Sequence, residues 1–145
     1  MTIDEIKALC LMSAPVGSRI TCNPPVLDTD EDMLVLVEAE KFMDFCHQLT
    51  GCGFSLDGSR VLAAGNSVDD PYHFQSFSLN GLNIIATAQL EFFWRFIAAS
   101  SIAKRLNLLN KDDRIALFQA VLYSTVDECL PSPTSNLAPI FEVAA

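Results

Sequence analysis

The sequence lacks a long hydrophobic run and has few basic residues. No apolar stretch in its 145 residues approaches the roughly 20 that span a bilayer, and its acidic start does not resemble a signal peptide. We therefore expect a cytoplasmic protein with no membrane partner. Lysine and arginine number 9 against 18 aspartates and glutamates, which gives a net charge of -9. Because proteins bind duplex DNA chiefly by neutralising its phosphates, we expect no duplex DNA partner.

Cysteine and histidine are too irregularly spaced for a disulfide framework or a zinc site. The five cysteines include no Cys-x-x-Cys pair, and His47 and His73 are isolated in the sequence. This pattern favours small buried or half-buried thiols in a reducing compartment. Cys46 and His47 are neighbours on an expected helix, where their side chains point in different directions, so the pair does not predict a cysteine hydrolase.

Half of the residues are hydrophobic, which is enough to build a buried core in a chain of this length. We expect a single domain over 1–130 and an irregular tail over 131–145, where three prolines occur. The acidic excess lies in the first half of the chain. Its densest cluster consists of Asp28, Asp30, Glu31 and Asp32.

Hydrophobic periodicity predicts helices and short strands in an irregular order. Helices are expected over about 2–12, 40–50, 88–106 and 110–124. Strands are expected over 33–37, as a central strand buried on both faces, over 54–57, and in a hairpin of 74–79 and 82–87. We interpret 58–71 as a mobile connection. This order predicts an α+β fold, a small mixed β-sheet with helices packed on one side.

The hairpin is the strongest local signal. Asn80-Gly81 separates its two strands, and both central residues of a type I′ turn need positive φ. A two-residue turn would pair Leu79 with Leu82 and Ser78 with Asn83, so that alternate residues face opposite sides of the sheet.

The residues best suited to chemistry are a Gly-Ser pair and two acids at a strand entrance. Asp30 and Asp32 are two residues apart, so both carboxylates can point to the same face. Two such acids repel unless a cation lies between them, and Mg²⁺ commonly uses one or two carboxylates together with substrate phosphates. Gly17 and Ser18 offer a backbone that can approach a phosphate closely, with a hydroxyl and amides as donors. Together they predict a metal–triphosphate site.

This arrangement resembles the nucleotidyltransferase superfamily, the fold shared by polymerase-beta-like enzymes and minimal nucleotidyltransferases. The resemblance rests on the Gly17-Ser18 pair, the loop after it and an Asp-x-Asp motif that opens a hydrophobic strand, and it covers 14–37. The chain also resembles small phage-encoded proteins of nucleotidyltransferase-like fold. That second likeness covers most of the chain and is carried by the segments 14–19, 21–25, 28–30, 104–109 and 113–120.

The resemblance implies a role for each residue of the site. Asp30 and Asp32 would be the catalytic acids and the ligands of Mg²⁺. The nucleotide-binding residues would be Gly17, Ser18, Arg19 and Asn83. The chain departs from the superfamily pattern at Glu31, where an apolar residue is usual between the acids, and at Pro15, in the strand before the Gly-Ser pair.

Asn83 is the most consequential departure. Active members of the superfamily place a third carboxylate on a neighbouring strand, and Asn83 stands in that position. A neutral amide can ligate a metal but cannot act as a general base. The resemblance therefore implies one of two functions. The first is transfer of a nucleoside monophosphate from a nucleoside triphosphate to a hydroxyl acceptor. The second is a catalytically degenerate fold that binds a host protein in the host cytoplasm.

The same residues also fit simpler interpretations. Asp30 to Asp32 alone would suit a solvated acidic loop at a sheet edge. Arg95 and Arg114 fit either a phosphate contact or a helix end. Three other cations near the same helix–turn–helix corner, Lys104, Arg105 and Lys111, are interpreted as solvated residues near helix ends.

Overall fold

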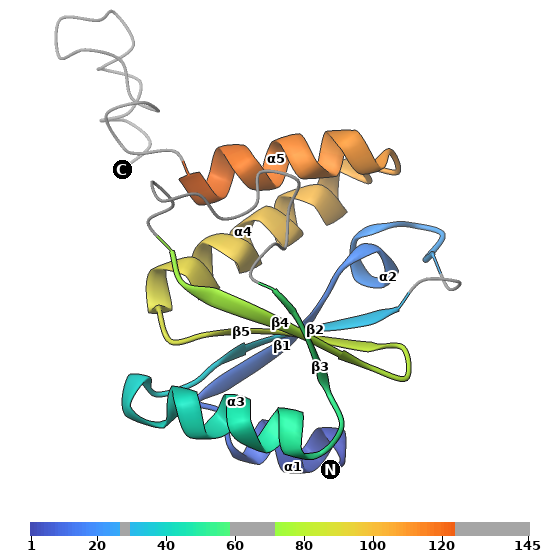
Figure 1. Cartoon of the computed structure of the whole chain (residues 1–145). Helices are drawn as coiled ribbons and strands as arrows, with labels where there is room; N and C mark the ends of the chain where they lie inside the picture. Colours follow the sequence, from blue (N-terminus) through green and yellow to red (C-terminus); the bar gives the residue numbers. More distant parts are fainter. Residues whose placement is uncertain (27–29, 59–71, 124–145) are drawn as a thin grey trace, which may run out of the picture.

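The computed structural model describes residues 1–26, 30–58 and 72–123. Five strands form one mixed sheet in the order β1-β2-β5-β4-β3 (Figure 1). The strands are β1 (Met12–Val16), β2 (Glu31–Leu36), β3 (Ser55–Gly58), β4 (Phe74–Leu79) and β5 (Leu82–Thr87). β2 runs parallel to β5 and antiparallel to β1, and β4 is antiparallel to both β5 and β3.

The helices of the described residues are α1 (Ile3–Ala8), α2 (Ser18–Thr21), the 3-10 turn η1 (Ala39–Lys41), α3 (Phe42–Gly51), α4 (Leu90–Leu106) and α5 (Lys111–Tyr123). The predicted α+β class and the small mixed sheet are confirmed. The predictions for 59–71 and 131–145 lie outside the described residues. Within the described part of the chain, no helix combines the length and the apolar character needed to cross a membrane.

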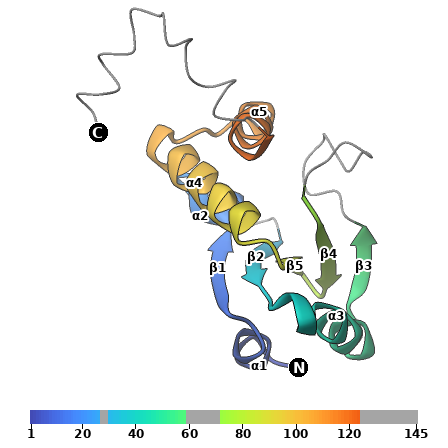
Figure 2. The ribbon, with the colours of Figure 1, turned by 90° about the vertical axis from the view of Figure 1, so that its left-hand side faces the viewer.

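The helices cover both faces of the sheet, so the expectation of helices on one side is wrong. Figure 2 shows α4 and α5 on one face and α1 and α3 on the other. The side chains of β2, an inner strand between β1 and β5, explain why both faces are covered. Leu34 and Leu36 pack with α4 and α5, while Met33 and Val35 pack with α1 and α3. All four are at most 5% exposed. A strand that is apolar on both faces needs both faces covered.

The hairpin forms as predicted. Asn80 and Gly81 both have positive φ, 49° and 81°, and Leu79 pairs with Leu82. β5 then lies beside β2, where Asn83 is the register partner of Asp32. The turn chemistry therefore places the amide of Asn83 next to the predicted acid.

Two predicted helix starts are confirmed by their caps. The Thr2 hydroxyl accepts from the Glu5 amide, and the Glu5 carboxylate accepts from the Thr2 amide. Asn110 caps the start of α5, because its Oδ1 accepts a hydrogen bond from the backbone amide of Asp112 at 2.8 Å. The first helix ends at Ala8, shorter than predicted, because the chain enters β1 at Met12.

An aromatic core joins the sheet to α4 and α5. Phe74 of β4 stacks on Phe92 of α4, with ring centroids 4.9 Å apart, and Phe96 of α4 meets Phe118 of α5 edge-on at 4.9 Å. These rings are at most 7% exposed. α5 packs mainly on α4, and residues of α5 and β5 line a common cavity.

Candidate functional site

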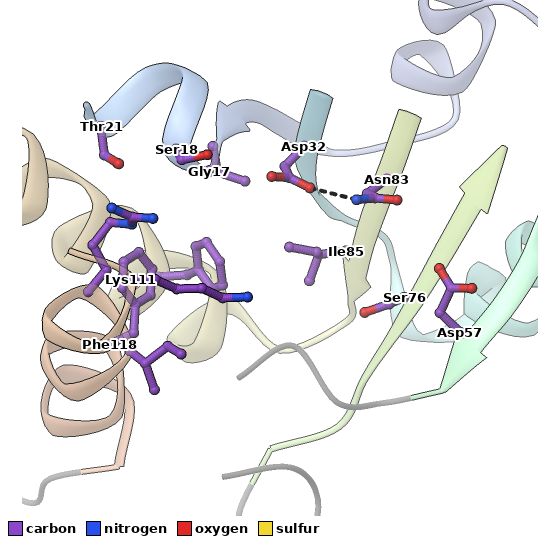
Figure 3. Close-up of a pocket in the computed structure, with 14 residues that line it drawn as sticks. Gly17, Ser18, Thr21, Asp32, Asp57, Ser76, Asn83, Ile85, Lys111 and Phe118 are labelled. Carbon is purple, nitrogen blue, oxygen red and sulfur yellow. Dashed lines mark hydrogen bonds between the residues drawn. The ribbon is translucent and has the colours of Figure 1, made fainter. Parts of the chain in front are cut away.

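A cavity of about 530 Å³ lies between α5 and the sheet (Figure 3). The turn after β1 lines it with Val16, Gly17, Ser18 and Thr21. The sheet lines it with Asp32, Asp57, Ser76, Asn83 and Ile85. The helices line it with Phe96, Lys111, Arg114, Ile115 and Phe118. The pocket thus has a polar wall on the sheet and a mixed basic and aromatic wall on α5.

One amide group joins the two predicted acids. Asn83 Nδ2 donates to Asp32 Oδ1 at 3.0 Å and to Asp30 Oδ2 at 3.3 Å. Both carboxylates therefore point toward the same position above β5, as their spacing predicts. The amide donor lies where a cation shared by two acids would lie, and it offsets part of their repulsion.

Asp32 carries the clearest electrostatic perturbation of the site. Burial raises the pKa of its carboxyl group above the usual value, and the nearby charge of Asp30 raises it further. The hydrogen bond from Asn83 and the charge of Arg19 act in the opposite direction. A half-buried carboxylate beside a second acid is a group that a bound cation would stabilise in its charged form.

Gly17 allows the turn after β1 to pass directly over Asp32. Its φ is 86° and its ψ is -179°, a region that is essentially restricted to glycine. A Cβ built on Gly17 would overlap the carboxylate of Asp32. The glycine therefore serves two purposes, the sharp turn into α2 and the close approach to the acid.

Replacement of Gly17 tests this close approach. We expect Gly17→Ala to lower the free energy of unfolding by about 2 kcal/mol or more, because the methyl group meets both a forbidden φ and the Asp32 carboxylate. Denaturant unfolding measures the change. The control is Gly51→Ala, since a Cβ at Gly51 meets nothing within 4 Å. Equal stability of the two variants would contradict the role assigned to Gly17.

Hydrogen bonds from distant segments hold α2 in place. Asn107, at the end of α4, donates through Nδ2 to the Asn23 carbonyl at 3.1 Å and accepts from the Asn23 amide at 2.9 Å. Arg114 Nη1 donates to the carbonyls of Leu108 at 2.9 Å and Leu109 at 2.8 Å, and it lies 3.4 Å from Cys22 Sγ. These contacts fix α2 and the start of α5 against the same turn.

Two cations of α5 line the pocket. Lys111 is exposed, and its side chain points across the pocket toward the sheet (Figure 3). Arg114 lines the same wall. Lys111 is thus a solvated residue at a helix end, as interpreted from the sequence, and it also lines the pocket. Arg95 instead binds Glu91 at 3.0 Å and the Val121 carbonyl at 3.0 Å, so it links α4 to α5.

Asp57 is a pocket residue that sequence analysis missed. It lies in β3 at a β-bulge, because Leu56 pairs with Phe77 while Gly58 already pairs with Ser76. Bulges often redirect a side chain near functional sites. The only sequence signal was a polar residue at the end of a short candidate strand, and its position depends on pairing between β3 and β4.

The structure brings most of the predicted site together. Gly17, Ser18, Asp32 and Asn83 line one pocket, and Asp30 joins it through Asn83. Arg19 is not among the lining residues, although its charge acts on Asp32. Ser18 and Asp32 therefore share one cavity, as the proposed metal–triphosphate site requires.

The acids present fit a cation that takes few protein ligands. Across the described ranges, no group of three or more histidines, cysteines, aspartates and glutamates could hold a metal ion. Asp30 and Asp32 would supply two carboxylates, while Asn83 turns its Nδ2 donor toward them and not its carbonyl oxygen. That donor set suits Mg²⁺, which commonly keeps several waters and binds substrate phosphates besides one or two carboxylates.

Comparison of the chain with protein-family models, with curated proteins and with solved structures finds no match.

Proposed function

We propose that the pocket binds a nucleoside triphosphate with Mg²⁺ and transfers its nucleoside monophosphate to a hydroxyl acceptor. The observation that carries this proposal is that Ser18, Asp32 and Asn83 line one cavity whose opposite wall holds Lys111. The volume of the cavity, about 530 Å³, lies within the usual range for small-molecule sites. The resemblance to nucleotidyltransferases supports the same role for Asp30 and Asp32, as ligands of Mg²⁺.

The opposed charges of the two walls suit a polyphosphate. Asp30 and Asp32 would hold Mg²⁺, which when bound neutralises charge on the phosphate oxygens. Lys111 and Arg114 would meet the phosphates from α5 as fixed positive charges. Ser18 would donate its hydroxyl hydrogen to a phosphate oxygen. Gly17 allows the turn that carries Ser18 to pack directly against Asp32, so the hydroxyl and the acid face the same cavity.

The transfer itself requires an acceptor hydroxyl in line with the bond that breaks. The acceptor oxygen forms a bond to the α-phosphorus, the bond from that phosphorus to the bridging oxygen breaks, and pyrophosphate leaves. The hydroxyl proton passes to solvent or to the carboxylate of Asp57, which lines the pocket. Asn83 cannot take that proton, because its amide is neutral.

Calorimetry with each of the four non-hydrolysable ribonucleoside triphosphates tests the binding step. We expect heat of binding with at least one of them in the presence of Mg²⁺ and none in EDTA. Incubation with labelled triphosphates then tests transfer to protein, RNA or small hydroxyl compounds. A folded sample that binds none of the triphosphates with Mg²⁺ would refute the proposal.

Lys111 offers a test that leaves the acids intact. We expect Lys111→Gln to weaken triphosphate binding roughly 10-fold, because a charge-assisted contact to phosphate contributes about 1.5–3 kcal/mol and an exposed one contributes less. Titration calorimetry measures the change. The matched control is Lys104→Gln, an exposed lysine of α4 that does not line the pocket. Equal loss in both variants would indicate a general charge effect.

One observation favours a second function, a binding module without catalysis. The Asn83 amide already donates to both acids, and it replaces the carboxylate that active members of the superfamily carry. In this case the pocket would take no triphosphate, and the acidic chain would bind a basic host protein through electrostatic steering. Absence of triphosphate binding together with capture of a defined basic partner would favour this second function.

A further inference from the structure

One face of α4 is apolar and exposed. Leu90, Trp94, Ile102 and Leu106 are between 39% and 61% exposed, and exposed Ala98 lies midway between them. The five residues recur at intervals of four and form one ridge, which winds around the helix by about 40° at each step. Trp94, Ala98 and Ile102 therefore share one face, and Leu90 and Leu106 lie at its two edges. Figure 2 shows α5 beside α4 on the side of β4 and β3, and α2, which also contacts α4, behind it.

This ridge is separate from the core-facing side of α4. Phe92, Phe93, Phe96 and Ala99 are buried against the sheet and α5, so the helix does not need the ridge for its own packing. A single exposed apolar residue is ordinary on a protein surface. A continuous row that includes a half-exposed tryptophan is typical of an interaction surface.

We propose that the ridge joins two copies of this chain, which pair antiparallel about a twofold axis at Ala98. The order of side chains supports this pairing, because it is nearly the same in both directions. Leucines stand at both ends, large apolar side chains stand at Trp94 and Ile102, and the smallest residue stands at the centre. An antiparallel copy therefore sets each large side chain near its counterpart, and the two alanines let the helices approach closely.

The charges on the same face select the antiparallel orientation. Glu91 and Arg105 are exposed and lie seven residues before and after Ala98. Glu91 binds Arg95 of its own helix through one carboxylate oxygen, Oε1, at 3.0 Å. An antiparallel copy brings the same carboxylate near Arg105 of the second copy, and the symmetry repeats that pair. A parallel copy would instead place like charges opposite each other, which disfavours it.

The charge balance of the whole chain also favours α4 as the surface through which two copies meet. The chain has a net charge of -9, so two copies repel through most of their surfaces. α4 carries Glu91 as its only acid against Arg95, Lys104 and Arg105. Two copies that meet through α4 therefore meet where the acidic excess is absent.

Trp94 is the only tryptophan, so its fluorescence reports on the ridge. With the full chain, sedimentation velocity should show a monomer that becomes a dimer between about 1 and 100 μM. The Trp94 emission should shift to shorter wavelength over the same range. A monomer at all these concentrations would overturn the proposal. So would blue-shifted emission that is independent of concentration, because this chain itself would then cover the ridge.

Ala98→Glu tests the centre of the contact. It brings two carboxylates together on the twofold axis, and we expect the dimer dissociation constant to rise at least about 100-fold. The control is Met43→Glu, which changes a residue 58% exposed on α3, on the other face of the sheet. Circular dichroism checks that both variants fold. A dimer that persists in Ala98→Glu would place the interface elsewhere and overturn the proposal.

Charge reversal tests the orientation. Glu91→Arg or Arg105→Glu alone should weaken the dimer roughly 3- to 30-fold, and the double variant should restore it, as expected for two symmetric surface pairs. In addition, a short bismaleimide should link Ala98→Cys into a dimer and should not link Met43→Cys. Failure of the double variant to restore the dimer, or of Ala98→Cys to cross-link, would overturn the antiparallel pairing.

Discussion

Asp32→Asn is expected to abolish Mg²⁺-dependent triphosphate binding and to leave the protein at least as stable as before at neutral pH. The loss of affinity should be at least about 100-fold, because even partners one step removed from a metal contribute 10- to 100-fold. Stability should not fall, because the burial of a charged carboxyl group disappears while the carbonyl oxygen of the introduced amide can still accept from Asn83. Calorimetry measures the affinity, and denaturant unfolding measures the stability.

The difference in stability between Asp32→Asn and the natural protein should change with pH in one direction. The pKa of Asp32 is higher in the folded state than in an unfolded chain, chiefly because the carboxyl group is buried. Its ionisation therefore costs folding free energy that is absent at low pH and fully present above the folded-state pKa. The stability advantage of Asp32→Asn should grow as the pH rises through that pKa.

Unfolding curves at a series of pH values from acidic to neutral measure this trend. The matched control is Glu31→Gln, which removes an exposed acid between the two predicted ligands and should change neither binding nor this pH dependence. Retained triphosphate affinity in Asp32→Asn would contradict the proposed role of the acid. A stability advantage that is constant with pH would contradict the assigned cause.

Local sequence signals were sufficient for the part of the site that lies on neighbouring strands. Asn80-Gly81 determines the register of the hairpin, and that register places Asn83 on the pocket side of β5. The apolar run after Asp32 predicts a central strand with the acids at its entrance. Each of these features depends on interactions between adjacent strands or within a few residues.

The basic wall of the pocket could not be predicted in the same way. Lys111 starts α5, and its distance from the acids depends on how Phe118 and Phe96 pack α5 over the sheet. Asp57 enters through a bulge that exists only when β3 pairs with β4. The second helical layer was missed for a different reason, because the predicted burial of 33–37 on both faces was not carried through to the placement of the helices. Coverage of both faces follows from the apolar character of β2 on both sides, whereas the helices alone do not indicate which face they cover.

Asn83→Asp is expected to turn the site into one that depends on a metal for its stability. Without Mg²⁺ the variant loses both hydrogen bonds from the Asn83 amide to the acids and gains a third carboxylate at that point. Loss of hydrogen bonds to charged groups and added repulsion should lower the free energy of unfolding by about 2–3 kcal/mol at neutral pH. Mg²⁺ at about 100 times its dissociation constant should restore about 2.7 kcal/mol.

The control variant is Asn83→Ala, which removes the same donors without adding a charge. It should be destabilised in EDTA and should gain less from Mg²⁺ than Asn83→Asp, since it offers the cation two carboxylates where Asn83→Asp offers three. Thermal unfolding in EDTA and in Mg²⁺ distinguishes the two variants. If Asn83→Asp also gains transfer activity, the natural amide limits catalysis in an otherwise complete site. If Mg²⁺ stabilises Asn83→Asp no more than Asn83→Ala, then Asp30, Asp32 and residue 83 do not converge on one cation, and the metal assignment is wrong.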